Sequence, residues 1–246
     1  MIHDKGEIMS FREDHKNDEL RPVRFTKNIM ENSYSSLLIE SGKTKVLCTA
    51  SIETKLPSHI DENQQGWLSA EYNMLPGSTL IRKSRATFKP DGRSIEIQRL
   101  IGRSLRAAID LKKIKGFAIV IDCDVIQADG GTRTSSITGG YCVLELAVRK
   151  MMDEGLIQSN PLTSRIASVS AGKIHGEILL DLNYDEDSQA EVDFNVVMND
   201  KLNFIEVQGT GEKGDLSKND LLLILDYCQS GIKKLFKKQM EFLDKI

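Results

Sequence analysis

The sequence of 246 residues lacks the features that mark several other classes of protein. No hydrophobic run approaches the ~20 residues that a membrane-spanning helix needs, and the N-terminal segment is too polar and acidic for a signal or transit peptide. We therefore expect a cytoplasmic protein with no membrane partner. The four cysteines form no CxxC pair and the four histidines are isolated, so neither a zinc site nor a redox motif is indicated. The cysteines are expected to be buried free thiols.

The chain as a whole also lacks an excess of either sign of charge. The formal net charge is only −3, so the whole molecule exerts no electrostatic attraction on nucleic acid. Segment 82–106 is the exception, because eight basic residues stand there against two acidic ones. Hydrophobic residues make up 40% of the chain and charged residues 28%, which is typical of a folded, water-soluble protein. Any attraction for an anionic polymer must therefore be local.

Hydrophobic periodicity predicts two groups of strands, each accompanied by helices. Strands are expected at 33–53 (a hairpin), 66–75, 116–129, 165–182 and 190–210 (the last two each folded around a turn), and helices at 94–111, 138–155 and 217–243. Segment 78–94 has weak periodicity and turn signals and is expected to be a loop. This order predicts an α+β fold of two related β-α subparts, residues 17–153 and 154–246, with helices packed on mixed sheets.

The stretch QADGGTRTSSITGG, residues 127–140, connects a predicted strand to a predicted helix. A glycine-rich turn at a helix N-terminus presents backbone N–H groups at the positive end of the helix dipole, which suits an anion such as phosphate. Arg133 adds a planar fork of donors, and hydroxyl groups are supplied by Thr132, Thr134, Ser135 and Ser136. The alternative is an ordinary turn whose hydroxyls satisfy only the helix terminus. Gly139 and Gly140 are expected inside the helix, where they permit close packing.

A second notable stretch is acidic. Its six carboxylates are Asp181, Asp185, Glu186, Asp187, Glu191 and Asp193. Such a group repels itself unless a cation or an arginine lies between its members, and hard oxygen ligands of this kind suit Mg²⁺. We interpret Asp185 and Glu186 as part of an acidic surface loop. Asp193 opens a predicted strand whose apolar residues face inward, so its side chain is expected to project with Asn195 from the opposite face.

Several stretches occur in a distinctive order, namely LRPV, TKVLCTASIE, GWLSAEYNMLPGST, GRSIEIQRLIGRSLRAAIDL, DCDVIQADGGTRTSSITGG, the acidic stretch and VVMNDKLNFIEVQGTGE. In this combination the chain resembles the ribonuclease PH family, from about Leu20 to the C-terminal helix. The resemblance implies two subparts of the ribosomal-protein-S5-domain-2-like type. It also implies a phosphate-dependent 3′-to-5′ exoribonuclease that releases nucleoside diphosphates from RNA in a reversible reaction, trims tRNA precursors, and assembles as a homohexamer, a trimer of dimers.

The same resemblance assigns roles to individual residues. The residues expected to bind the phosphate co-substrate are Arg93, Gly131, Thr132 and Arg133. Those expected to bind a magnesium ion are Asp187 and Asp193, and catalysis is assigned to Arg93, Arg133 and these two aspartates. The residues expected to contact RNA are Arg82 and Arg85. Two departures from the family are Gly77, which stands where relatives have an arginine, and the segment after Gln208, which lacks the usual proline and phenylalanine.

The residues leave other interpretations open. Arg99, Arg103 and Arg106 share one face of a predicted helix, which either contacts RNA, with Arg99 as our candidate, or forms a solvated or subunit-facing stripe. For the chain as a whole, the alternatives are a non-catalytic RNA-binding ring subunit and a hydrolytic metal nuclease. The presence of both aspartates and of the phosphate-binding arginines favours the phosphorolytic enzyme. Dependence on phosphate distinguishes all three.

Overall fold

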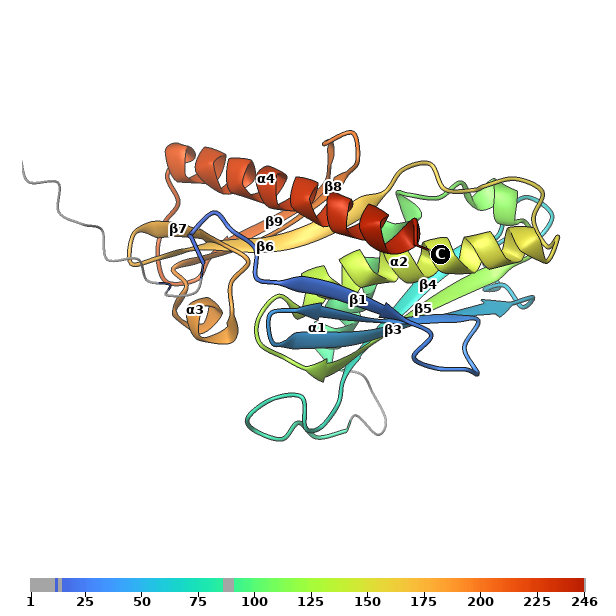
Figure 1. The fold of residues 1–246 in the computed structure, drawn as a ribbon, viewed down its shortest axis with the longest axis horizontal. Helices are drawn as coiled ribbons and strands as arrows, with labels where there is room; N and C mark the ends of the chain where they lie inside the picture. The colour runs from blue at the N-terminus through green and yellow to red at the C-terminus, as the bar shows by residue number, and fades with distance from the viewer. Residues whose placement is uncertain (1–11, 13–14, 86–90, 246) are drawn as a thin grey trace, which may run out of the picture.

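The computed structural model describes residue 12 and residues 15–85 and 91–245, and in it two β-sheets are each covered by helices (Figure 1). The strands are β1 (Val23–Lys27), β2 (Ser35–Ser41), β3 (Thr44–Glu53), β4 (Trp67–Met74), β5 (Ala118–Gln127), β6 (Ile166–Ile174), β7 (Glu177–Leu180), β8 (Val192–Asn199) and β9 (Phe204–Gly211). The helices are α1 (Gly92–Arg106), the 3₁₀ helix η1 (Leu111–Ile114), α2 (Thr132–Asp153), α3 (Tyr184–Gln189) and α4 (Lys218–Leu243). This confirms the predicted α+β class.

The first sheet has the order β1-β2-β3-β5-β4. Strands β2 and β3 form the predicted hairpin, in which Ser41 pairs with Thr44 across a two-residue turn. Gly42 takes the left-handed conformation that such a turn needs, with φ of 55°. Strand β4 runs parallel to β5 while the other pairs are antiparallel, so this sheet is mixed. The ends of β4 and β5 lie side by side and lead to the two segments that carry the predicted RNA and phosphate residues.

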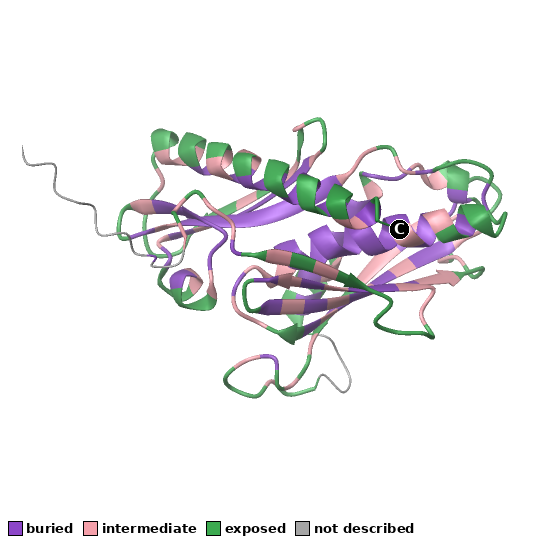
Figure 2. Cartoon of the chain, viewed as in Figure 1, coloured by how far each residue is buried: buried purple, intermediate pink, exposed green. Residues whose placement is uncertain are grey.

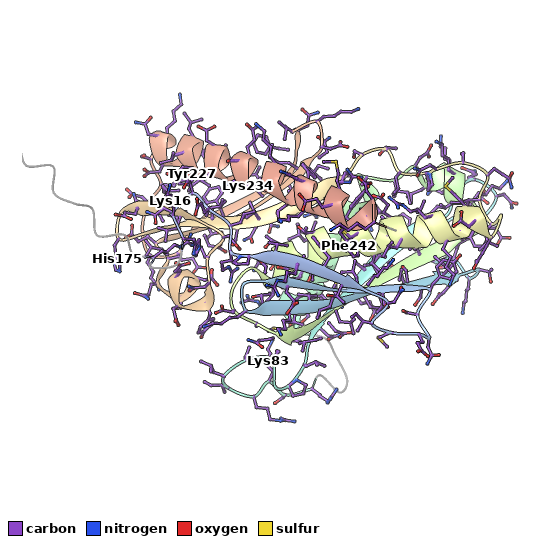
Figure 3. The ribbon with its side chains drawn as sticks, viewed as in Figure 1. Lys16, Lys83, His175, Tyr227, Lys234 and Phe242 are labelled. Carbon is purple, nitrogen blue, oxygen red and sulfur yellow. The ribbon has the colours of Figure 1, made fainter. Side chains whose placement is uncertain are left out.

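The second sheet has the order β7-β6-β8-β9 and is antiparallel throughout. Helix α4 packs on one face of it through the apolar stripe Ile224, Cys228, Ile232, Leu235 and Phe236. The outer face of α4 is exposed (Figure 2). His175, at the turn between β6 and β7, has a φ of 50° and lies at the left-hand end of this sheet in Figure 3.

Helix α2 lies between the two sheets, beneath α4 and above the first sheet (Figure 1). Most of its residues are buried, because it packs on β2, β3 and β5 on one side and on β6 on the other. Gly139 permits this approach, since an added Cβ would lie 2.8 Å from Ile39 Cγ2 and 2.9 Å from Cys48 Sγ. The predicted packing role of Gly139 is therefore confirmed. At Gly140 the same Cβ would make only ordinary contacts of 3.5 Å.

The local predictions differ in how well the structure bears them out. Helix α2 begins at Thr132, six residues before the predicted start, and α1 begins at Gly92, inside the predicted loop. Residues 78–85 of that loop contain no helix or strand, and residues 86–90 lie outside the described part of the chain. All four cysteines are buried free thiols, as expected. The boundary at residue 154 stays a prediction, because α2 contacts both sheets.

Within the described ranges, no helix combines the length and the apolar character that crossing a membrane requires.

Candidate active site

Helix α2 begins with an uncapped N-terminus. Gly130 and Gly131 have left-handed backbones, with φ of 73° and 63°, which glycine adopts without steric cost. Gly131 is the N-cap residue, and no side chain among the described residues accepts a capping hydrogen bond there. The first N–H groups of a helix have no partner within the helix. Those of Thr132 and Arg133 therefore lie at the positive end of the helix dipole without a side-chain cap, an arrangement that suits an anion.

The hydroxyl residues of this stretch belong to α2 itself. Thr134 Oγ1 donates to the carbonyl oxygen of Gly131 at 3.0 Å, and Ser136 Oγ donates to that of Thr132 at 2.8 Å. Thr134, Ser135 and Ser136 are all buried. The expectation that these hydroxyls offer donors to an anion is wrong for Thr134 and Ser136, whose hydroxyl hydrogens are used inside the helix. Of the four hydroxyl residues, only Thr132 is half-buried.

Tyr72 is a member of the site that the sequence reasoning missed. Its hydroxyl lies 2.9 Å from Thr132 Oγ1, and it reaches the start of α2 from β4. Burial raises the pKa of Tyr72, whereas the hydrogen bond with Thr132 and the charges of Arg93 and Arg133 lower it. Both arginines therefore lie near this hydroxyl. A buried tyrosine needs a partner for its O–H group, and that signal could have identified the residue.

The two predicted metal-associated aspartates face the same place. Burial raises the pKa of Asp187, and the charges of Arg93 and Arg133 act in the opposite direction. Burial and then repulsion by Asp187 raise the pKa of Asp193 to about 6, against the charge of Arg133. The four predicted catalytic residues are thus electrostatically linked around the start of α2.

Asp193 is held as its strand pattern predicts. The neighbours of Asp193 in β8, Val192 and Phe194, are buried in the core beneath α4. Asp193 therefore projects from the other face together with Asn195, whose Nδ2 donates to Asp193 Oδ2 at 3.3 Å. This confirms the predicted orientation and leaves the second carboxylate oxygen for other contacts.

The interpretation of Glu186 as part of a surface loop is wrong. The segment is helix α3, and Glu186 closes a capping box with Asn183 at its start. Its carboxylate also accepts two hydrogen bonds from Arg12, from Nε at 2.6 Å and from Nη2 at 2.7 Å, in a buried ion pair. Asp185 is exposed, as expected. Local sequence could not reveal the burial of Glu186, because its arginine partner lies 174 residues away.

The acidic side of the site offers the carboxylate oxygens that Mg²⁺ takes as ligands. In the described part of the chain, no three or more His, Cys, Asp or Glu side chains are grouped so that they could hold a metal. Mg²⁺ often uses only one or two carboxylates, with waters and substrate phosphates as further ligands. Asp187 and Asp193 repel one another, and the charge of Glu212 raises the pKa of both. A cation between the two aspartates would relieve that repulsion.

The two residues expected to contact RNA from the loop after β4 lie at the surface. Arg82 and Arg85 are exposed on the loop after β4, and Figure 3 shows Lys83 of that loop well away from Lys234 and Tyr227 of α4. A cavity of about 270 Å³ opens there, lined among others by Lys83, Arg85 and Ser94. The cavity thus extends from Arg85 on the loop to Ser94 in α1, the residue that follows Arg93 in the chain.

The arginines on α1 have separate environments. Arg99 is exposed. Arg103 forms two hydrogen bonds with Glu206 of β9, at 2.8 and 2.9 Å. Arg106 stacks over Trp67 at 4.9 Å and donates to the carbonyl oxygen of Leu68. Within this stripe, Arg99 therefore stays the candidate for RNA, while Arg103 and Arg106 connect α1 to the two sheets.

Comparison with known proteins identifies the family. Models of the 3′ exoribonuclease family match residues 19–149 as domain 1 and residues 164–230 as domain 2. Ribonuclease PH of Crocosphaera subtropica is 51% identical over 226 residues, which cover 92% of this chain and 94% of that protein. The chain belongs to the ribonuclease PH family. Ribonuclease PH of Bacillus subtilis is 48% identical over 232 residues, covering 93% and 94% of the two chains.

Solved structures show the same fold at low identity. Rice Rrp46 matches with a TM-score of 0.76 and 16% identity, covering 94% of this chain and 98% of that one. A chain of the Archaeoglobus fulgidus exosome with RNA bound to the active site matches with a TM-score of 0.76 and 21% identity, covering 91% and 90%. Membership of the ribonuclease PH family confirms the predicted activity, a phosphate-dependent 3′-to-5′ exoribonuclease. The roles of single residues stay predictions.

Proposed function

We propose that inorganic phosphate binds at the start of α2 and cuts the 3′ end of RNA there. The observation that carries this proposal is the uncapped N-terminus of α2, which has two arginines and two half-buried carboxylates around it. Arg93 and Arg133 bind the phosphate oxygens with the backbone N–H groups of Gly131, Thr132 and Arg133. The hydrogen bond between the Tyr72 and Thr132 hydroxyls fixes Thr132 beside them.

The reaction needs no nucleophile from the protein. An oxygen of the bound phosphate forms a bond to the terminal phosphorus of RNA, and the bond from that phosphorus to the preceding 3′ oxygen breaks. The 3′ oxygen leaves as a hydroxyl after taking a proton from the attacking phosphate, and a nucleoside diphosphate is released. Reversal of the same step adds a nucleotide. Arg93 and Arg133 orient the attacking anion and offset the repulsion between the two phosphates.

Asp187 and Asp193 are the residues that hold Mg²⁺ in this proposal. The ion supplies positive charge to the phosphoryl oxygens of the scissile group. The two carboxylates keep that charge at a fixed place opposite the arginines, and Asn195 limits the rotation of Asp193 through its hydrogen bond.

The RNA enters past the loop after β4. Arg82 and Arg85, with Arg99 on α1, contact its backbone, and the adjoining cavity at Lys83 and Ser94 lies on this path. Support comes from the similar fold of an archaeal exosome solved with RNA bound to its active site. We further propose that the cellular substrates are tRNA precursors in the cytoplasm and that six chains assemble as a trimer of dimers.

Phosphate dependence tests the reaction. The protein is incubated with a 3′-labelled RNA and Mg²⁺, with and without inorganic phosphate, and the released nucleotides are separated. Nucleoside diphosphates that require phosphate are expected. Nucleoside monophosphates would instead indicate a hydrolytic nuclease, and no release would indicate a non-catalytic RNA-binding subunit.

Asp193→Asn tests the metal assignment. The variant keeps the shape and the hydrogen bond with Asn195 but loses the charge, so turnover should be lost while circular dichroism shows an intact fold. Near-normal phosphate-dependent release by this variant would contradict the assignment.

Sizing of the protein by light scattering tests the assembly. The proposal expects six times the chain mass of 27.5 kDa, whereas a stable monomer would contradict it.

A further inference from the structure

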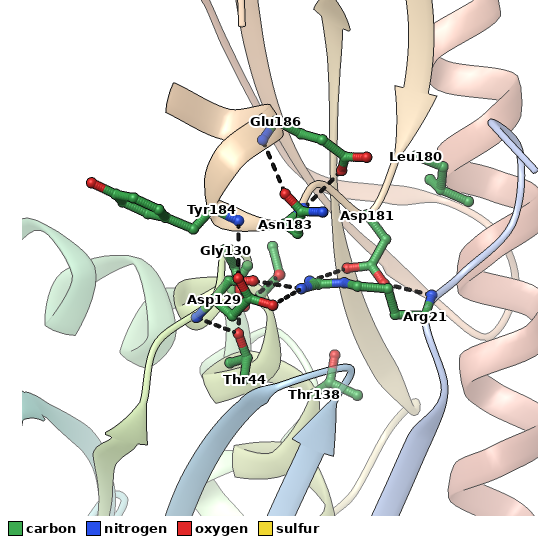
Figure 4. A network of polar contacts seen from close by, with 12 residues as sticks. Arg21, Thr44, Asp129, Gly130, Thr138, Leu180, Asp181, Asn183, Tyr184 and Glu186 are labelled. Carbon is green, nitrogen blue, oxygen red and sulfur yellow. Dashed lines mark hydrogen bonds and ion pairs between the residues drawn. The ribbon is translucent and has the colours of Figure 1, made fainter. Parts of the chain in front are cut away.

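A buried ion pair joins the two halves of the chain next to the phosphate site. Arg21, two residues before β1, donates through Nη2 to Asp181 Oδ1 at 2.7 Å, and its backbone N–H donates to Asp181 Oδ2 at 2.9 Å. Asp181 directly follows β7. Each side chain is only 6% exposed. Figure 4 shows the pair beside the turn that opens α2.

The same arginine binds that turn. Arg21 Nη1 donates to the carbonyl oxygen of Asp129 and lies 3.8 Å from its carboxylate. From the other side, Thr44 accepts a hydrogen bond from the Asp129 N–H at 2.9 Å and donates to the carbonyl oxygen of Gly130 at 2.6 Å. The backbone just before Gly131 is therefore fixed by a guanidinium on one side and a hydroxyl on the other (Figure 4).

The turn is also in direct contact with the segment that leads to Asp187. The carboxylate of Asp129 accepts a hydrogen bond from the N–H of Tyr184, the first residue of α3, at 3.4 Å. At Gly130 a Cβ would lie 2.2 Å from the carbonyl oxygen of Leu182, so only glycine permits this approach. Asp187 lies in the same short helix, and its position thus depends on the same contacts.

Asp181 is held in a conformation that its own backbone disfavours. Its φ of 54° lies in the left-handed region, which costs an L-residue on the order of 1 kcal/mol and persists where the surroundings impose it. Two hydrogen bonds from Arg21 impose it here. The planar guanidinium presents its donors in a fixed fork, so the pair sets a geometry as well as a charge balance.

We propose that Arg21 and Asp181 are positioning residues that set the separation between the phosphate turn (residues 129–131) and helix α3, which carries Asp187. Neither is assigned a contact with substrate. The inference rests on the proposed function, because it assumes that phosphate binds at Gly131 to Arg133 and that Asp187 acts opposite it. A small change in this separation misaligns the attacking phosphate, and displacements of about 1 Å can lower rates about 100-fold.

Arg149 provides a comparison from elsewhere in the fold. Like Arg21 it donates to a carbonyl oxygen and to a carboxylate, those of Leu243 at 2.8 Å and Glu145 at 2.6 Å, but its side chain is 39% exposed. These contacts join α2 to the end of α4. Arg149 has no part in the proposed site, so its removal reports the effect of losing such contacts elsewhere in the fold.

The test compares four proteins in steady-state phosphorolysis of a single-stranded RNA with Mg²⁺. They are the parent chain, Arg21→Lys, the double variant Arg21→Met/Asp181→Asn, and Arg149→Met. Lysine keeps the charge but cannot bind both the turn and Asp181 in the same fork. The double variant leaves no buried charge unpaired, and asparagine tolerates the left-handed backbone at residue 181. It therefore keeps the test valid if Arg21→Lys does not fold.

For each folded protein, kcat/KM is measured separately for phosphate and for RNA. We expect kcat/KM for phosphate to fall about 10-fold or more in both Arg21 variants, with the KM for RNA unchanged and Arg149→Met equal to the parent. Unchanged phosphate kinetics in the Arg21 variants would overturn the positioning role. So would an equal loss in Arg149→Met. A parent chain that needs no phosphate would instead overturn the proposed function itself, and the inference with it.

Discussion

The two long helices begin in opposite ways. Helix α4 starts at Ser217, whose hydroxyl accepts the N–H of Asp220 at 3.1 Å while the Asp220 carboxylate accepts the N–H of Ser217. Helix α2 starts at Gly131, with no side-chain cap among the described residues. A cap stabilises a helix by about 1 kcal/mol. Helix α2 lacks that contribution, and its N–H groups are left for a ligand.

The nearby acids show the same contrast. Hydrogen bonds from Lys173 and Ser217 lower the pKa of Asp220 at the start of α4. Near the start of α2, burial and mutual repulsion raise the pKa of Asp193 to about 6. At the start of α4 the charge of Asp220 is stabilised by the protein's own donors, whereas the charges of Asp187 and Asp193 near the start of α2 repel one another. The capped start of α4 stabilises its helix, whereas the start of α2, beside acids with raised pKa values, is a candidate functional site.

The largest expected effect comes from replacing Arg133, the second residue of α2. Arg133→Ala should lower kcat/KM for phosphate by about 100- to 1000-fold, because it removes a charged donor from the attacking anion. Asn219 occupies the same position in α4 and is exposed, so Asn219→Ala should match the parent. Steady-state kinetics with varied phosphate measure both. Equal kinetics for the two variants would remove the functional distinction between the helix starts.

A smaller effect is expected when α2 receives a carboxylate at its N-cap. Gly131→Asp and Gly131→Asn introduce side chains of the same shape, both of which meet Arg21 Nη2 at 3.2 Å and Thr134 Oγ1 at 3.3 Å through the new Cβ. The aspartate carries a negative charge, whereas the asparagine is neutral and its amide also has an N–H donor group. We expect the KM for phosphate to be about 10-fold higher in Gly131→Asp, since the carboxylate competes for the N–H groups. Identical KM values would argue against an anion at this position.

The two acids should respond oppositely to pH. The pKa of Asp193 is raised on folding, so its ionisation destabilises the fold as pH rises from about 4 to about 6. Asp193→Asn should therefore raise the free energy of unfolding by about 3 kcal/mol at pH 7 without Mg²⁺, and by nothing below pH 4.

The pKa of Asp220 is lowered on folding, so its contribution is present above the unfolded pKa and is lost as pH falls through the folded one. Asp220→Asn should destabilise the fold at pH 7 and leave it unchanged in acid. Urea unfolding at several pH values measures both variants. Curves that shift in the same direction would contradict the contrast.

The smallest effect is expected at the cap of α4. Ser217→Ala should lower the free energy of unfolding by about 1 kcal/mol, and the melting temperature by about 2–4 °C, with no change in the KM for phosphate. Calorimetry and kinetics on the same sample test this. A raised KM for phosphate would show that the α4 cap also serves the site.

Local sequence was sufficient for much of the fold. The strand pattern of β2 and β3, the position of helix α4 and the orientation of Asp193 were all predicted, because each depends on residues close together in the chain. The start of α2 was predicted six residues too late. Its first turn contains Thr132, Thr134, Ser135 and Ser136, which look like loop residues, and tertiary packing against both sheets makes them helical.

The sequence by itself determined the order of the elements, the apolar stripe of α4 and the residues that identify the family. Only the tertiary structure decided that Glu186 is buried, that Tyr72 binds Thr132, and that Arg21 joins the phosphate turn to the segment after β7. The physical reason is distance along the chain. Arg21 and Asp181 are separated by 160 residues, and periodicity reports which face of an element is buried without stating what lies against it.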